Sequence, residues 1–534
     1  MAEKYFNQPS VMTAQQHFSG APQSDIQRSR FDRSHAYKTT FDAGYIFPFM
    51  CDEVLPGDTF NLGVTSFARL ATPLKPFMDN VYLDIQFFFV PNRLVWDNWQ
   101  QFMGERLNPD DDPLVFTMPQ ATVDTSVADG ATLPEYFGIP PMVGTVQVQA
   151  LPFRAYCLIW NEWYRDQNLQ DRIFISTGDG PDTWTGSQPL ARGKRHDYFT
   201  SCLPWPQKGS AVTIPIGVSA PVLTSNTDTV TGVQAAMGFN TVGGGNPAAG
   251  SLNVAADGFA YQAVPAGTFG NSVYPSNLYA DLTAATSISI NDLRTAFQIQ
   301  RLLERDARGG TRYIELILSH FGVRSPDARL QRPEFLGGGT TRVNINPVAA
   351  TAPLPDAPQG NLAAYGTAAI RAGFSKSFTE HGFIIGLASA RADLTYQQGI
   401  ERFWFRQTRF DHYWPAFAHL GEQAVLNREI YAQGTGADTD VFGYQERFAE
   451  YRYKPSRITG LFNSGHAESL DVWHLSQDFG SLPLLNDAFI RDNPPIDRVI
   501  AVTTEPHFLA DFWIQMKCDR PMPIYSIPGF IDHY

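Results

Sequence analysis

Two segments near opposite ends of the chain place apolar residues at every second position, and this alternation limits the fold more than any other feature. The first runs from Val81 to Phe89 and ends at Pro91, and the second covers residues 508–518. A period of two residues predicts β-strands that lay one face on an apolar core. The other face of the first strand is mixed, as in an antiparallel sheet covered on one side only; it carries Tyr82, Asp84, Gln86 and Phe88.

Shorter strand signals accompany these two segments. They lie at residues 60–64, 383–387, 400–405, 470–475 and 496–503. Short strands toward both chain ends, joined by long connections, predict a mainly β sandwich whose first and last strands are neighbours, as in a jelly roll.

Helical periodicity appears in four places, at residues 94–103, 153–164, 293–303 and 314–321. The first two carry aromatic stripes, which indicate packing more strongly than base stacking. Ser289 or Asn291 is a candidate N-cap of the third helix, and Gly322 is expected to end the fourth.

The length of 534 residues exceeds one compact core, so we expect two domains or one domain with large insertions. Residues 205–290 contain only four charged side chains and long runs of small residues, which predict a functional excursion. The expected segments are an arm (1–50), first strands with helical insertions (51–204), the charge-poor insertion (205–290), a helical insertion (291–336), a Gly/Pro/Ala-rich loop (337–373) and the remaining strands with a tail (374–534).

Charged residues form only 17% of the chain, whereas 43% of residues are hydrophobic and 13% are aromatic. A surface this poor in charge is typical of a subunit that its neighbours cover. The net charge of −13 repels nucleic acid, so any DNA contact must be local.

One local concentration of positive charge lies near the N-terminus, where Arg28, Arg30, Arg33 and Lys38 outnumber the nearby carboxylates. Two interpretations stay open. The segment is either a solvated terminus or an arm that lies on nucleic acid or on a neighbouring subunit.

Signals for catalysis or metal binding are weak. The run from Asp110 to Asp112 lacks the spacing and glycine of a calcium loop, so a solvated turn is favoured. The histidines show no ligand spacing, and the glycine triplets at 243–245 and 337–339 are not followed by the Lys-Ser/Thr pair of a phosphate loop. The four cysteines form no CxxC pair, and no stretch reaches the roughly 20 apolar residues of a membrane span. We therefore predict no cofactor, no metal, no enzyme activity and no membrane insertion.

Long peptides rather than a site carry a family resemblance. In the N-terminal part they are RSRFDRSHAYKTTFDAG (28–44), DEVLPGDTFNL (52–62), FARLATP (67–73) and MDNVYLDIQFFFVPNRLVWDNWQQFMGE (78–105). In the C-terminal half they are GEQAVLNREIY, FGYQERFAEYRYKPS, WHLSQDF and RPMPIYSIPGFIDH. These peptides resemble the major capsid proteins of microviruses, small single-stranded DNA phages, in the gokushovirus branch. The chain departs from the family mainly in residues 205–290 and 337–373.

The resemblance implies an eight-stranded antiparallel jelly roll of the viral capsid type, with long loop and helix insertions, and sixty copies closing into a T=1 icosahedral shell around circular single-stranded DNA. It further implies a small basic DNA-packaging protein and a DNA pilot protein as partners, and assembly of the virion in the bacterial cytoplasm. The insertion at 205–290 would rise as a threefold protrusion that meets a host receptor. Its tip candidates are Val242, Gly243, Gly244, Gly245 and Asn246, and the DNA-facing candidates are Arg28, Arg30, Arg33 and Lys38.

A rival from another class is a secreted jelly-roll lectin or carbohydrate-active enzyme. It would require paired carboxylates or an aromatic sugar site, and usually a signal peptide. The first residues, MAEKYFNQ, have neither the basic nor the apolar region of such a peptide.

Overall fold

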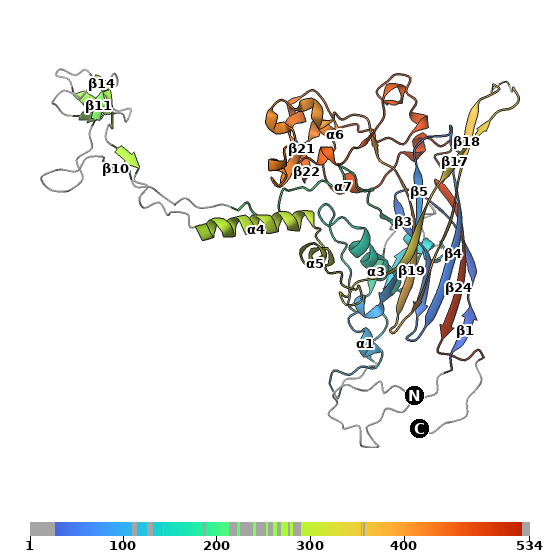
Figure 1. The fold of residues 1–534 in the computed structure, drawn as a ribbon. Helices are drawn as coiled ribbons and strands as arrows, with labels where there is room; N and C mark the ends of the chain where they lie inside the picture. The colour runs from blue at the N-terminus through green and yellow to red at the C-terminus, as the bar shows by residue number, and fades with distance from the viewer. Residues whose placement is uncertain are drawn as a thin grey trace. The chain divides into compact units, whose positions relative to one another are not determined.

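Two compact units make up the chain in this computed structural model (Figure 1). The smaller unit is Gln207–Asp306, and the larger unit consists of the chain up to Pro206 together with the chain from Ala307 onward. The fold is mainly β, and its large sheets are antiparallel. The structure describes residues 27–108, 110, 115–124, 132–141, 144–184, 188–212, 222–224, 239–241, 252–254, 260–263, 269–275, 278–280, 290–353, 355 and 358–525.

A six-stranded antiparallel sheet forms one layer of the sandwich in the larger unit. Its central strands, β4 (Thr59–Leu70) and β24 (Phe508–Arg520), pair from Thr59 opposite Asp519 to Leu70 opposite Phe508. Buried and exposed residues alternate along both strands, which confirms the strands predicted from the period of two. The remaining strands are β1 (Ser29–Asp32), β2 (His35–Phe41), β17 (Asn344–Ala349) and β18 (Leu362–Ser377).

A five-stranded antiparallel sheet faces it. In β5 (Val81–Pro91), the predicted mixed face is in fact covered: Phe88 is buried beneath aromatic side chains, and Asp84 is buried in ion pairs. The prediction of an open second face was wrong, because side chains from other parts of the chain cover that face. Trp163 packs on Phe88, and Arg192 pairs with Asp84. The other strands are β16 (Glu334–Arg342), β19 (Gly382–Ala392), β3 (Tyr45–Val54) and β9 (Leu190–Ala191).

The apolar core lies between the two sheets. Phe49 of β3 stacks on Phe512 of β24 across the two sheets with ring centroids 4.6 Å apart, whereas Phe41 of β2 stacks at 5.0 Å on Phe508, its partner on the neighbouring strand of the same sheet. All four side chains are buried. Burying each contributes roughly 1.5–3 kcal/mol to stability, and the Phe49–Phe512 contact joins the two sheets.

The Gly/Pro/Ala-rich segment 337–373, which was expected to be a loop, instead belongs largely to strands β16, β17 and β18. The small residues lie where the two sheets approach each other. A Cβ atom added at Gly337 would lie 3.0 Å from the carbonyl oxygen of Gly373 in the other sheet, and one added at Gly373 would lie 2.2 Å from that of Leu62 on the neighbouring strand of its own sheet. The composition therefore reflects close backbone packing and not a flexible connection.

Part of the expected N-terminal arm is also strand. Both β1 and β2 pair antiparallel with β24, along its C-terminal and N-terminal parts respectively. The polar composition misled the prediction because edge strands expose most of their side chains. Residues 1–26 of the expected arm lie outside the described residues.

Helices and short sheets cover the outer face of the five-stranded sheet. Helix α3 (Leu151–Ile159) continues into a π-helical turn, η4 (Trp160–Tyr164), and its aromatic stripe packs on β5, which confirms the packing prediction. The helix expected at 94–103 is interrupted, because Trp96 turns inward and its indole nitrogen donates to Asp179. The other elements here are η2 (Asn92–Leu94), α1 (Trp99–Phe102), α2 (Leu133–Tyr136), β6 (Gln120–Asp124), β7 (Thr145–Gln149), β8 (Asp182–Trp184) and α5 (Tyr313–Phe321), which ends at Gly322 as predicted.

The long connection between β19 and β24 contains mostly turns. The strand predicted at 383–387 is confirmed within β19, but those predicted at 400–405, 470–475 and 496–503 are wrong. Single 3-10 turns occupy these places; the last follows Pro494 and Pro495, which have no backbone donor for a ladder. The elements are β20 (Thr395–Tyr396), η5 (Arg402–Phe405), η6 (Arg409–Asp411), η7 (Pro415–Phe417), β21 (Glu422–Leu426), α6 (Asn427–Ile430), η8 (Gly436–Thr439), β22 (Val441–Glu446), η9 (Ala449–Tyr451), β23 (Ser456–Arg457), η10 (Gly460–Phe462), η11 (Asp471–Trp473), α7 (Asp487–Ile490) and η12 (Ile496–Arg498).

The smaller unit contains short strands and most of α4 (Ile290–Arg308). The helix is confirmed, but Asn291 lies inside it and is not its N-cap; Ser289 lies outside the described residues. A four-stranded sheet has the order β11-β14-β13-β12, and β10 pairs with β15. Their bounds are β10 (Val222–Thr224), β11 (Phe239–Thr241), β12 (Leu252–Val254), β13 (Ala260–Ala263), β14 (Phe269–Pro275) and β15 (Leu278–Ala280).

Candidate functional surfaces

The four basic residues expected to face DNA lie along the edge formed by β1 and β2. Arg30 pairs with Asp519 at 2.7 Å, Arg33 with Asp52 at 2.6 Å, and Lys38 with Asp511 at 3.8 Å. The guanidinium of Arg28 donates to the carbonyl oxygen of Gly57. The structure thus brings these cations to one edge and also places a carboxylate beside three of them.

The residues expected at the tip of a surface protrusion, Val242, Gly243, Gly244, Gly245 and Asn246, lie outside the described residues. Their role in host contact stays a prediction. Asp111 and Asp112 of the acidic run also lie outside them.

The outward face of the six-stranded sheet carries exposed apolar side chains. Phe67 of β4 and both Leu509 and Trp513 of β24 are about half exposed. Because Phe67 lies opposite Asp511, the other two are its diagonal neighbours on the same face. An apolar group of this kind beside the Lys38–Asp511 pair is typical of a surface that another protein covers.

A second exposed group belongs to the connection between β19 and β24, and we call it the aromatic surface. Trp404 is 69% exposed and Phe410 is 63% exposed, although large aromatic rings gain most from burial. Arginines lie over several rings, as Arg409 does over Trp414 at 4.8 Å. The aromatic surface consists of Phe403, Trp404, Phe410, Tyr413, Trp414, Tyr451 and Tyr453.

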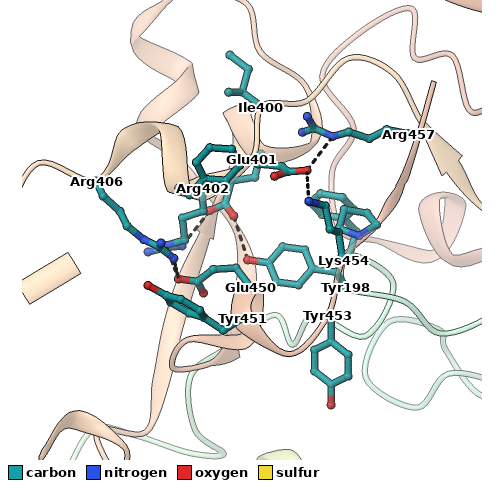
Figure 2. Close-up of a pocket in the computed structure, with 14 residues that line it drawn as sticks. Tyr198, Ile400, Glu401, Arg402, Arg406, Glu450, Tyr451, Tyr453, Lys454 and Arg457 are labelled. Carbon is teal, nitrogen blue, oxygen red and sulfur yellow. Dashed lines mark hydrogen bonds and ion pairs between the residues drawn. The ribbon is translucent and has the colours of Figure 1, made fainter. Parts of the chain in front are cut away.

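Beside the aromatic surface lies a cavity of about 300 Å³ (Figure 2). In its wall the carboxylate of Glu429 is buried and accepts from Arg402 at 2.9 Å, from the Tyr198 hydroxyl at 2.9 Å and from the Leu426 backbone N–H at 3.0 Å. Burial raises the pKa of Glu429 above its ordinary value, and the charge of Arg402 opposes that rise. Burial is also the main cause of the raised pKa of Tyr198.

Further ion pairs continue along the same wall, as Figure 2 shows. Glu450 accepts from Arg406 at 3.1 Å in this wall. It also accepts from the Gln423 side chain at 2.7 Å. Glu401 pairs with Lys454 and with Arg457, each at 3.5 Å. These carboxylates are engaged within the chain in ion pairs that range from partly buried to exposed, and such pairs join the loops that carry them.

Other kinds of chemistry find little support in the part of the chain that the structure describes. Within it, no group of three or more His, Cys, Asp or Glu side chains is arranged to hold a metal ion. All four cysteines have free thiols, and burial raises the pKa of Cys157 to about 12, so this thiol is not an activated nucleophile. Among the described helices, none combines the length and apolar character needed to cross a membrane.

Sequence reasoning missed the aromatic surface. The stretch from Phe403 to Phe417 is dense in aromatic and arginine residues but has no period of two or 3.6 residues. The high density of aromatic residues without a regular period could have indicated this surface. Side chains that face a partner need not follow the period of a strand or helix that faces the core.

Comparison with known families gives one match across nearly the whole chain. Residues 19–530 match the family described as "Capsid protein (F protein)". This match includes every strand of both large sheets.

Similar proteins with assigned names agree with that match. The chain is 48% identical to "Capsid protein VP1" of Bdellovibrio phage phiMH2K over 522 residues, covering 96% of this chain and 98% of the relative. It is 44% identical to "Capsid protein VP1" of Chlamydia phage 1, covering 98% of each chain. The protein of the same name from Spiroplasma virus 4 is 39% identical, with 97% of this chain and 98% of the relative covered.

Proposed function

Because this chain belongs to the capsid protein (F protein) family of phages, we propose that its copies assemble into a closed T=1 icosahedral shell of sixty subunits around circular single-stranded DNA. The single observation that carries the proposal is near full-length similarity to named capsid proteins. The rival, a lectin or carbohydrate-active enzyme, has no comparable support.

Exposed apolar surface supports self-assembly. The aromatic surface and the outward face around Phe67 and Trp513 leave large rings in water, and subunit interfaces are enriched in such rings. Two different patches on one subunit allow it to contact two different neighbours. Contacts of this kind, repeated by rotation, build a closed symmetric assembly. Within the subunit, we propose that eight strands of the two packed sheets form the jelly roll.

Enclosure of DNA requires that the electrostatic repulsion between the acidic chain and the DNA phosphates be offset. Its net charge of −13 supports a role for a small basic packaging protein as partner, alongside a DNA pilot protein. Arg28, Arg30, Arg33 and Lys38 remain candidates for DNA contact, although three of them already have carboxylate partners. Host contact through residues 242–246 and assembly in the bacterial cytoplasm complete the proposal.

Sedimentation of the purified full chain tests the shell. We expect fast-sedimenting closed particles, and in infected cells these should protect single-stranded DNA from nuclease. A chain that stays a slow-sedimenting monomer under all assembly conditions would contradict the proposal. A separate experiment tests the N-terminal cations. Replacing Arg28, Arg30 and Arg33 together by Ala should lower the DNA content per particle. A normal DNA content would reject the DNA-binding role of these residues and leave the shell proposal unaffected.

A further inference from the structure

A second, larger cavity of about 840 Å³ lies within the larger unit, and none of its lining residues belongs to the aromatic surface. Its walls include the π-helical turn after α3, the start of α5 and the edge strand β16. This volume falls in the range of roughly 300–1,000 Å³ that is usual for ligand sites. The function derived so far makes no use of it.

Positive charge dominates this cavity. Seven Arg and Lys side chains line it against three carboxylates, in a chain whose net charge is −13. Part of that charge is neutralised inside the protein: Asp84 pairs with Arg192 at 2.7 Å and with Arg391 at 3.0 Å. Arg308 pairs with Glu422 in the same way.

Three cations of the lining keep their charge without such a partner. Within the described residues, no carboxylate forms an ion pair with Arg165, Lys194 or Arg324. Arg165 donates to the carbonyl oxygen of Gln170 at 2.8 Å, Lys194 lies over the Phe489 ring at 4.4 Å, and Arg324 is exposed.

Burial and, for Arg165, a neighbouring cation act on the pKa values of these side chains. Burial and then the neighbouring guanidinium of Arg312 lower the pKa of Arg165, and burial lowers the pKa of Lys194 to about 8. Asp492, which lies near Lys194, has its pKa raised to about 7 by burial and is therefore a weak counter-charge at neutral pH. The buried Nε–H groups of Arg165 and Arg312 have no acceptor among the described residues.

Aromatic rings share the walls with these cations. Phe335 is 40% exposed, and Trp163 and Tyr164 lie beside it. One face of Trp163 is covered by Arg332 at 4.3 Å. Cations for phosphates together with rings for bases are the combination by which proteins hold single strands without sequence preference.

We propose that this cavity binds a short segment of single-stranded DNA, with Arg165, Arg324 and Lys194 contacting phosphates and Phe335 offering a ring face to a base. The inference rests on the proposed function, because it names where the enclosed genome meets the subunit. The aromatic wall favours DNA over an acidic peptide, because bases can stack on the rings whereas an acidic peptide would use only the cations. The cavity volume also suits a short segment of DNA.

Ultraviolet crosslinking of intact particles, followed by mass spectrometry of the crosslinked peptides, tests the location. We expect DNA crosslinks on peptides that contain Trp163, Tyr164 or Phe335. DNA-filled particles whose crosslinks map only elsewhere would overturn the cavity assignment and leave the shell proposal standing. A chain that forms no DNA-filled particle would instead defeat the shell proposal.

A binding measurement on the unassembled full chain tests the residues independently of assembly. Replacing both Arg165 and Arg324 by Ala should weaken binding of an oligothymidylate about tenfold and reduce the slope of affinity against salt by about 1–2. Arg371→Ala removes an exposed arginine of β18 and is the matched control. Arg324→Ala alone, at an exposed position, should give part of the effect without endangering the fold.

Two results would contradict the proposal. One is an unchanged affinity and salt slope in the double variant, with the circular dichroism spectrum of the wild type. The other is equal binding of oligoglutamate of the same charge, which would show attraction by charge alone and assign the cavity to an acidic peptide.

Discussion

The sandwich and the connection between β19 and β24 are both rich in aromatic residues, yet they use them in opposite ways. In the sandwich, Phe49, Phe87 and Phe512 are buried between two sheets. In the connection, Trp404 and Phe410 are exposed, and a smaller apolar cluster around Val425 and Phe442 is supplemented by ion pairs such as Arg402–Glu429. Aromatic content alone therefore does not separate residues that stabilise one subunit from residues available to the next.

The largest expected effect is in the sandwich. Phe512→Ala leaves a cavity beneath the stacked ring of Phe49, and we expect a loss of about 3–5 kcal/mol in the free energy of unfolding, enough to prevent recovery of folded chain. Denaturant unfolding measures it. Trp404→Ala is the matched aromatic control, and a similar loss in that control would erase the contrast between the two regions.

Assembly should show the reverse behaviour. We expect the combined Trp404→Ser and Phe410→Ser variant to fold with its unfolding free energy within about 0.5 kcal/mol of the wild type. It should nevertheless fail to form fast-sedimenting particles, because interface rings contribute much of the association energy. Phe174→Ser removes another exposed aromatic side chain and serves as control. Normal particles from the double variant would remove the aromatic surface from the assembly argument.

A smaller effect is expected in the ion-pair network. Arg402→Leu leaves the buried Glu429 carboxylate without its cation, which should cost roughly 2 kcal/mol, below the range for fully buried pairs because Arg402 is partly exposed. Lys454→Leu removes an exposed pair in the same connection and is the control.

The same variant has a characteristic pH dependence. The folded pKa of Glu429 is already raised by burial, and removal of Arg402 raises it further. Stability from a raised pKa is present at low pH and is lost as the pH rises through the folded value. The destabilisation should therefore be greater at pH 8 than at pH 5 in urea unfolding, and a constant difference would speak against an electrostatic role for Arg402.

The smallest effect is expected at the sheet edge. Lys38→Ala breaks an exposed pair with Asp511 at 3.8 Å, and we expect a change within about 0.5 kcal/mol. A double-mutant cycle with Asp511→Ala measures the coupling directly. Coupling well above 1 kcal/mol would mean that the edge depends on charge as the connection does.

The candidate sites differ in how far sequence could reach them. Arg28, Arg30, Arg33 and Lys38 were found because they are neighbours in the chain, but the carboxylate partners of Arg30 and Lys38 lie near the other end of the chain. The cations of the large cavity were missed since Arg165, Lys194 and Arg324 are far apart in sequence. No local sequence pattern predicts a cluster of residues that are brought together only by folding.

Sequence alone was enough to predict the long strands β5 and β24, the first part of β4, the helices α3, α4 and α5, and the family, because periodicity and long peptide similarity are local properties of the chain. Only the tertiary structure decided that residues 337–373 are largely strand, that both faces of β5 are covered and that seven cations share one cavity. These outcomes depend on which distant backbones approach closely enough to exclude a side chain or to bury a charge.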